Sequence, residues 1–81
     1  MARVVLPQAL AARAGGQLEH EIEGRNVRAL LAALEARFPG LAEELEGRVA
    51  VAIDGEIHND PMLEAVGPDS EVHFLPRVGG G

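Results

Sequence analysis

Length, composition and charge limit the function classes open to this chain. It has 81 residues, no Cys, and 13 acidic against 7 basic side chains, which gives a formal net charge of −6. A chain of this length forms one small domain with a modest core. The absence of Cys excludes disulfides, zinc ribbons and a Cys nucleophile. The acidic balance argues against nucleic acid as a partner.

Neither a membrane span nor a secretory signal is predicted. No apolar run in the sequence approaches the length that crosses a bilayer. The apolar stretch near the N-terminus is broken at once by Pro7 and followed by Arg13, unlike the core of a signal peptide. We therefore expect a cytoplasmic protein that has no membrane partner.

The N-terminal third predicts two paired strands. Residues 3–6 form a β-branched and apolar run that Pro7 ends, which indicates a short first strand. The Gly15-Gly16 pair predicts a turn, and residues 17–23 then alternate weakly between apolar and charged positions. In this second strand His20 falls on the apolar side.

A helix over residues 27–38 is the strongest local pattern. Asn26 is a favourable N-cap, and Pro39-Gly40 ends the helix. The apolar residues between them recur at helical spacing along one stripe: Val27, Leu30, Leu31, Leu34 and Phe38. Residues 41–45 predict one further helical turn.

The C-terminal half predicts a hairpin and a last strand. Residues 49–53 alternate Ala with larger Val and Ile, and Asp54-Gly55 is typical of a type I′ turn that leads back through residues 56–58. Residues 62–66 predict an irregular connection whose apolar side chains, Met62, Leu63 and Val66, cover the core. Residues 71–75 form the last strand, which Pro76 ends.

These elements predict an α+β fold, a mixed sheet of four to five strands with one main helix on one face. Strand alternation puts Val72 and Phe74 on the helix side, and His73 and Leu75 on the other. We expect a shared core of Leu30, Leu31, Leu34, Val51, Ile53, Val72 and Phe74. Since one helix covers one face only, the opposite face stays open and offers Leu75 to a partner.

The residues that usually carry catalysis are nearly absent. The three His residues fall on separate predicted strands without metal-binding spacing, Ser70 is the only Ser, and there is no Thr. The acidic runs fit the solvated sides of a strand and a helical turn. We expect no catalytic residue, no metal site and no bound cofactor in this chain, which would not act as an enzyme by itself.

The C-terminus has the clearest functional pattern. The strand leads directly into Arg77-Val78-Gly79-Gly80-Gly81, so we expect a folded domain over residues 1–76 and a flexible tail over 77–81. Glycine has no Cβ, and a diglycine end therefore passes through a channel too narrow for side chains. Five residues beyond Pro76 reach at most about 17 Å. Such a tail suits delivery of the Gly81 α-carboxylate into another protein's active site.

The whole chain resembles the ubiquitin-like β-grasp sulfur carriers, the MoaD/ThiS-like family of molybdopterin-synthase small subunits and thiazole-synthesis carriers. The features that carry the resemblance are the order of the elements and five short segments. These segments are Phe38-Pro39-Gly40, Ile53-Asp54-Gly55-Glu56, the turn over residues 67–72, the strand end at Leu75-Pro76, and the tail itself. The resemblance implies a ubiquitin-like β-grasp fold.

The resemblance also implies a mechanism. An adenylating enzyme of the ubiquitin-activator type would use ATP to activate Gly81, and a sulfur donor would convert the adenylate to a thiocarboxylate. An acceptor enzyme would then take the sulfur in cofactor or cysteine biosynthesis. The residues implied to meet these partners are Gly81, the tail residues Gly80, Gly79, Val78 and Arg77, and the tail root Leu75 and Pro76.

Several functions stay open within this resemblance. Residues 6–10 and 14–17 look like those of carriers that supply sulfur for cysteine synthesis, which suggests a cysteine synthase-like acceptor. The short stretch between helix and third strand, and Gly67-Pro68 in place of the usual Asp-Gly turn, depart from that pattern. One alternative is the small subunit of molybdopterin synthase, whose acceptor would be the large subunit. The other is a non-activated ubiquitin-like binding module, or a protein tag joined through Gly81.

Overall fold

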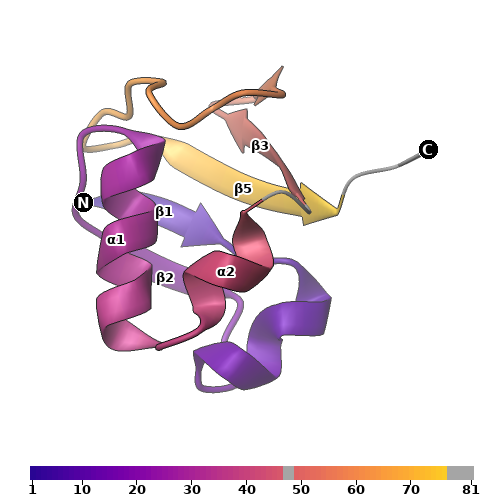
Figure 1. The fold of residues 1–81 in the computed structure, drawn as a ribbon. Helices are drawn as coiled ribbons and strands as arrows, with labels where there is room; N and C mark the ends of the chain where they lie inside the picture. Colours follow the sequence, from indigo (N-terminus) through magenta and orange to yellow (C-terminus); the bar gives the residue numbers. More distant parts are fainter. Residues whose placement is uncertain (47–48, 77–81) are drawn as a thin grey trace.

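The fold is a mixed five-stranded sheet with helices on one side, as a computed structural model describes it for residues 1–46 and 49–76 (Figure 1). The elements are β1 (Ala2–Val5), the 3-10 helix η1 (Gln8–Ala14), β2 (Glu19–Ile22), α1 (Val27–Arg37), α2 (Leu41–Leu45), β3 (Val49–Ile53), β4 (Glu56–His58) and β5 (Glu71–Pro76). The strand order is β2-β1-β5-β3-β4, with β1 and β5 parallel and all other neighbours antiparallel. The predicted α+β class and mixed sheet are confirmed.

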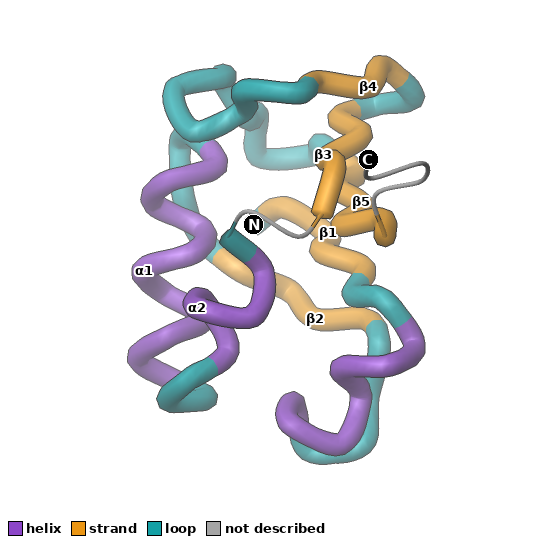
Figure 2. The backbone as a smooth tube through the Cα atoms, turned by 45° about the vertical axis from the view of Figure 1, so that its right-hand side comes forward, coloured by secondary structure: helices purple, strands orange, loops and turns teal. Residues whose placement is uncertain are grey.

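The core lies between the sheet and the two α-helices, which share one side of it (Figures 1 and 2). Every residue predicted for the shared core is buried there. Further core side chains come from the sheet edge and from α2, among them Ile22, Leu41 and Leu45. Because both helices cover the same side, the opposite side of the sheet is left open.

Local signals set the limits of α1. The Asn26 side chain accepts a hydrogen bond of 2.8 Å from the backbone N–H of Ala29, so the predicted N-cap is confirmed. The helix ends at Arg37, one residue before the predicted end, and Phe38 is its C-cap. The Glu35 carboxylate then accepts bonds from the N–H groups of Gly40 (2.8 Å) and Ala42 (3.1 Å). These bonds tie α1 to the start of α2.

The β3–β4 hairpin has the predicted turn. Asp54 and Gly55 have φ values of 50° and 88°, the left-handed pair that a type I′ turn requires. Asp54 is also the only described non-Gly residue with positive φ. The turn aligns Ile57 with Ala52 across the hairpin.

Two features differ from the sequence prediction. The helix η1 was not predicted, because a short 3-10 segment lacks the long apolar stripe that marks an α-helix. It buries Ala14 and packs Leu10 against the core. Leu63, expected to cover the core, is 78% exposed, whereas Val66 is buried and Met62 half-buried. The irregular backbone of this connection has no period that would reveal which side chains turn inward.

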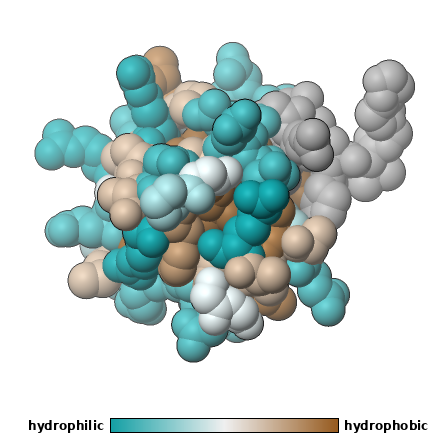
Figure 3. Space-filling model, turned by 60° about the horizontal axis from the view of Figure 1, so that its bottom comes forward, coloured by the Kyte–Doolittle hydropathy of each residue, from teal (hydrophilic) through white to brown (hydrophobic). Residues whose placement is uncertain are grey.

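The surface is largely hydrophilic around the helices. Viewed from the α2 and η1 end, polar side chains project outward and apolar atoms show between them (Figure 3). Within the described residues, no helix is long and apolar enough to cross a membrane.

Candidate functional site

The strand β5 carries the chain toward its C-terminal tail through the middle of the sheet. It pairs with β1 on one side and β3 on the other. Its last residue, Pro76, lies opposite Val49. The predicted tail residues Arg77, Val78, Gly79, Gly80 and Gly81 lie outside the described residues. The site is therefore built from the tail root and the surrounding sheet.

The side of the sheet away from the helices is the open face. Strand alternation and register assign to it Arg3, Val5, Glu19, Glu21, Ala50, Ala52, Ile57, Glu71, His73 and Leu75. As predicted, Val72 and Phe74 point to the core, while His73 and Leu75 lie on this face. Its apolar residues lie mainly around the tail root and on β3 and β4, and we call them the apolar end; its charged residues lie mainly on β2, β1 and the start of β5, and we call them the charged end.

The apolar end is formed by Leu75 and its cross-strand neighbours. Leu75 lies opposite Ala50. The next row across the sheet contains the apolar residues Val5, Ala52 and Ile57, with His73 between Val5 and Ala52 and Glu19 at its β2 end. Leu75 is 36% exposed and Ile57 63% exposed. Apolar groups gathered on an exposed sheet are typical of an interaction surface.

The charged end is held together by ion pairs. Arg3 bonds Glu19 through Nε at 2.9 Å and contacts it through Nη2 at 2.6 Å, and its Nη1 lies 3.6 Å from Glu71. His73 Nε2 lies 2.9 Å from the Glu71 carboxylate and donates to it, since an ionised carboxylate only accepts. The hydrogen bond from His73, followed by the charge of Arg3, holds the pKa of Glu71 below its ordinary value.

A clamp of hydrogen bonds fastens the start of β5 to the hairpin. The Asp54 carboxylate accepts bonds from the Ser70 hydroxyl at 2.9 Å and from the backbone N–H of Glu71 at 2.8 Å. The Ser70 hydroxyl in turn accepts from the N–H of Gly67 at 2.9 Å. Ser70, 9% exposed, thus uses its hydroxyl to join the start of β5 to the hairpin. The clamp fixes the register in which β5 leads to the tail.

The three His residues have separate surroundings. His20 is buried, bonds the backbone oxygen of Gln17 at 2.9 Å, and packs edge-on against Phe38. His58 lies near Glu56 and Glu64 at the hairpin edge. In the part of the chain that the structure describes, no group of three or more His, Cys, Asp and Glu side chains could hold a metal ion.

The sequence-based prediction placed Leu75 and His73 on the open face and did not identify the residues that surround them there. Leu75 lies where it was expected, and Pro76 ends β5. Val5 and Ile57 were missed as surface residues because each belongs to a short strand whose register is set by distant partners. Arg3 and Glu71 were not paired by the prediction, since the parallel contact of β1 with β5 has no local sequence signal.

The sequence of the chain matches a known protein family. The ThiS family matches residues 4–81, nearly the whole chain. No curated protein matches the sequence significantly.

Three solved structures have similar folds. A crystal structure of Mycobacterium tuberculosis CysO, described as an antigen, is 24% identical and covers 96% of this chain and 100% of that one, with a TM-score of 0.88. A chain of the Amycolatopsis orientalis BexX/CysO complex is 24% identical over 100% of both chains, with a TM-score of 0.87. The small archaeal modifier protein 1 (SAMP1) of Methanosarcina acetivorans is 24% identical over 99% of this chain and 95% of that one, with a TM-score of 0.81. Together with the family match, which extends through the last residue, the mixed sheet and its open face show that the chain belongs to the ThiS family of ubiquitin-like β-grasp sulfur carriers.

Proposed function

We propose that the α-carboxylate of Gly81 is the reactive group of this protein and carries sulfur as a thiocarboxylate. The observation that supports this most is the family match through residue 81, combined with a central strand that leads directly to the Gly79-Gly80-Gly81 end. The protein would be a cosubstrate, and its chemistry would be catalysed by partner enzymes. Because the activation needs ATP, we place it in the cytoplasm.

Activation comes first. One carboxylate oxygen of Gly81 attacks the α-phosphorus of ATP in an adenylating enzyme, which forms an acyl adenylate and releases pyrophosphate. The three terminal glycines present no side chain to the enzyme's channel. Arg77 would remain at the channel mouth and pair there with a carboxylate or phosphate of the partner.

Sulfur then replaces the adenylate. A sulfide-class nucleophile attacks the acyl carbon of Gly81, the C–O bond to the phosphate breaks, and AMP leaves. The resulting thiocarboxylate sulfur bonds to an electrophilic carbon of the substrate in an acceptor enzyme, and either that carbon's leaving group departs with its electron pair or its π bond breaks and the neighbouring atom takes up a proton. Hydrolysis of that adduct leaves the sulfur on the acceptor product and restores the Gly81 carboxylate with an oxygen from water.

The open face would dock the activating enzyme. Its apolar end lies beside the tail root, so contact there would align the tail with the enzyme's channel. The net charge of −6 would steer the protein toward a basic partner surface, and association should slow as salt screens that attraction. A salt-independent association rate would contradict this docking mode.

A cysteine synthase-like enzyme is our first choice of acceptor. Residues 6–10 and 14–17, which follow β1 and include parts of helix η1 and the turn after it, resemble the corresponding parts of cysteine-synthesis carriers. The fold similarity to two proteins named CysO adds support. The large subunit of molybdopterin synthase is the alternative acceptor, and single-turnover loss of sulfur from Gly81 in the presence of each purified enzyme distinguishes the two.

A modifier role is the second candidate function. The fold similarity to a protein named as a small archaeal modifier favours it. In that case the activated Gly81 would join a Lys of another protein. The chain has no Lys, so it would not form such a bond with side chains of its own copies.

Intact mass spectrometry tests the proposal. The purified protein is incubated with an adenylating enzyme of the ubiquitin-activator type, ATP and sulfide, and the expected product is heavier by the difference between one sulfur and one oxygen atom. Omission of ATP should abolish the change. A covalent adduct with another protein, without any exchange of oxygen for sulfur, would support the modifier role instead. An unchanged mass under all conditions would contradict both.

A further inference from the structure

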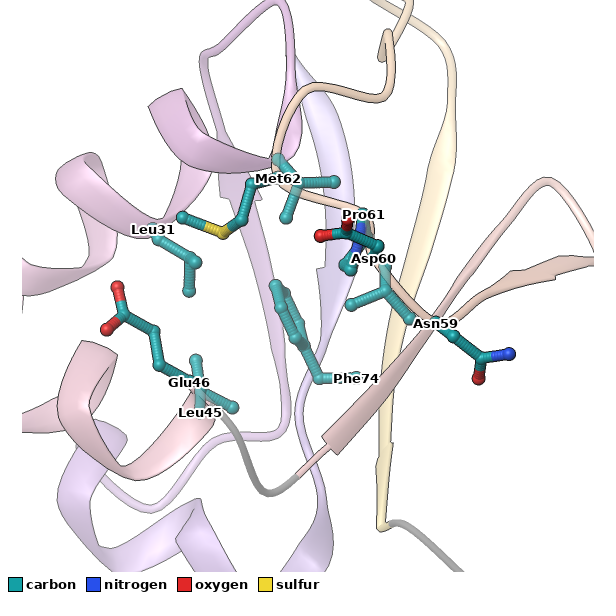
Figure 4. Close-up of a pocket in the computed structure, with 10 residues that line it drawn as sticks. Leu31, Leu45, Glu46, Asn59, Asp60, Pro61, Met62 and Phe74 are labelled. Atoms are coloured by element: carbon teal, nitrogen blue, oxygen red, sulfur yellow. The ribbon is translucent and has the colours of Figure 1, made fainter.

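A pocket lies on the opposite side of the sheet from the open face. It occupies about 320 Å³ between α1, α2, the strands β3 and β5, and the connection that follows β4 (Figure 4). Strand alternation separates the two surfaces, because Val51 and Phe74 point into the pocket while Ala50 and Leu75 lie on the open face. A molecule in this pocket would not contact the open face.

The pocket has an apolar floor and an acidic rim. Its floor consists of Leu31, Leu45, Val51, Phe74 and the half-buried Met62. In Figure 4 the Phe74 ring stands in the middle, with the Glu46 carboxylate on the helix side and the Asp60 carboxylate on the connection side. Both acidic residues are exposed. The volume is at the lower end of the range for ligand sites, about 300–1000 Å³, and suits one or two apolar side chains.

The charge of the rim restricts the occupant. Among the described residues, neither Glu46 nor Asp60 forms an ion pair, whereas Glu19 and Glu71 on the open face share Arg3. An anionic ligand would be repelled by both rim carboxylates and by the net charge of −6. A ligand with a cation beside an apolar group would pair its charge with the rim carboxylates and place its apolar group against the floor.

The neighbouring surface favours a protein segment over a small molecule. Leu63 follows Met62 directly and is 78% exposed, so apolar surface continues past the pocket along the connection. A small ligand held in the pocket would leave this side chain in water. A peptide segment that crosses the pocket would cover it.

We propose that this pocket is a second protein-docking site, which receives one Leu-sized apolar side chain flanked by Arg or Lys residues of a partner. Docking here leaves the open face and the tail root accessible. Two partners could therefore hold the carrier at the same time, one on each side of the sheet. The inference goes beyond the proposed sulfur chemistry and does not depend on Gly81.

Peptide titration followed by NMR tests the site. The chain has two Met residues, so the methyl signal of Met62 reports on the pocket and that of Met1, which is 67% exposed and lies elsewhere, serves as internal reference. The probes are the blocked peptides acetyl-Arg-Leu-Arg-amide, acetyl-Glu-Leu-Glu-amide and acetyl-Arg-Ser-Arg-amide, together with leucinamide. We expect a saturable shift of Met62, without a matching shift of Met1, that is strongest with the first peptide.

Charge variants provide the matched control. The double variant Glu46→Gln/Asp60→Asn should weaken binding of the first peptide by about tenfold, from about threefold per exposed carboxylate. The control Glu23→Gln/Asp69→Asn removes the same charge from exposed positions outside this pocket and should leave binding nearly unchanged. Equal weakening in both variants would overturn the proposal.

Other results would also overturn it. One is a Met62 signal that moves no more than Met1 at the highest soluble peptide concentration. Another is equal binding of the basic and acidic Leu peptides. Binding of leucinamide as tight as that of the first peptide would assign the pocket to small amphipathic cations instead. None of these measurements involves the activating enzyme, so their failure is distinguishable from failure of the thiocarboxylate proposal.

Discussion

The two faces of β5 differ in what they do, although their residues alternate along one short strand. Val72 and Phe74 are 0% and 2% exposed and belong to the core, while Leu75 is 36% exposed and His73 lies at the edge of a charged cluster. One face therefore supplies stability, and the other is the face that we propose for docking of partners. Since neighbouring residues have such different environments, a substitution on the core side of β5 should mainly lower stability. A substitution one position away, on the open face, should mainly weaken partner binding.

Core truncation should have the largest effect on stability. Leu34 is 0% exposed at the centre of the α1 interface with the sheet, so Leu34→Ala should cost about 2–5 kcal/mol of unfolding free energy. Leu75→Ala on the open face should cost less than about 1 kcal/mol. Urea denaturation of the two variants measures this contrast. Similar losses would contradict the division between the faces.

The Asp54 clamp should have the next largest effect. Asp54→Ala removes acceptors from Ser70 and Glu71 and puts Ala at a positive φ, which should cost about 2–3 kcal/mol. Asp54→Asn keeps one acceptor oxygen and tolerates this backbone conformation, so its cost should be about 1 kcal/mol. Denaturation measures both costs. Equal costs for the two variants would contradict this ranking, because they would mean that Asn at position 54 keeps none of the advantage expected from its acceptor oxygen and its tolerance of a positive φ.

The open face should matter for binding more than for stability. Leu75→Ser should weaken association with the activating enzyme by about fivefold, because the exposed part of this apolar side chain would no longer be buried on docking. Leu75→Met keeps the apolar character and should bind nearly as well as the original protein. Surface plasmon resonance measures both. Unchanged binding of the Ser variant would exclude the apolar end as the docking surface.

The ion pairs of the charged end should have the smallest effect. The pKa of Glu71 is lowered in the folded protein, so its ionised form contributes stability above the unfolded pKa of about 4.3 and loses it as pH falls through the folded pKa. The small stability advantage of the original protein over Glu71→Gln should therefore be fully present at neutral pH and decrease as the pH falls below the unfolded pKa of about 4.3. Denaturation at a series of pH values measures it. A stability difference between the original protein and Glu71→Gln that grows as the pH falls would contradict a lowered pKa of Glu71.

Much of the fold could be predicted because its signals are local. The apolar stripe of α1, the Asn26 cap and the Asp54-Gly55 turn each lie within a few residues, and each appears in the structure as expected. The core side of β5 followed from alternation alone. The helix η1 and the outward position of Leu63 could not be predicted, because short irregular segments take their conformation from what they pack against.

The candidate site was less predictable than the fold. Leu75 could be assigned to the open face from the alternation along its own strand. Which residues of other strands lie beside it depends on the strand order and register. Ile57 joins it only because β4 pairs with β3, and Val5 only because β1 runs parallel to β5. The Arg3–Glu71 ion pair crosses the same long-range parallel contact. No pattern within one segment contains this information.

The central claim is that the chain end, and no side chain, is the working group. ATP–pyrophosphate exchange by an adenylating enzyme of the ubiquitin-activator type measures activation of the chain end directly, with the original protein compared to a variant that lacks Gly81 and to Gly80→Val. We predict that both changes abolish exchange while the unfolding free energy stays within about 0.5 kcal/mol, as is usual for surface substitutions. Exchange at the original rate with the truncated chain would contradict the claim, because the Gly81 carboxylate would then not be the group that ATP activates.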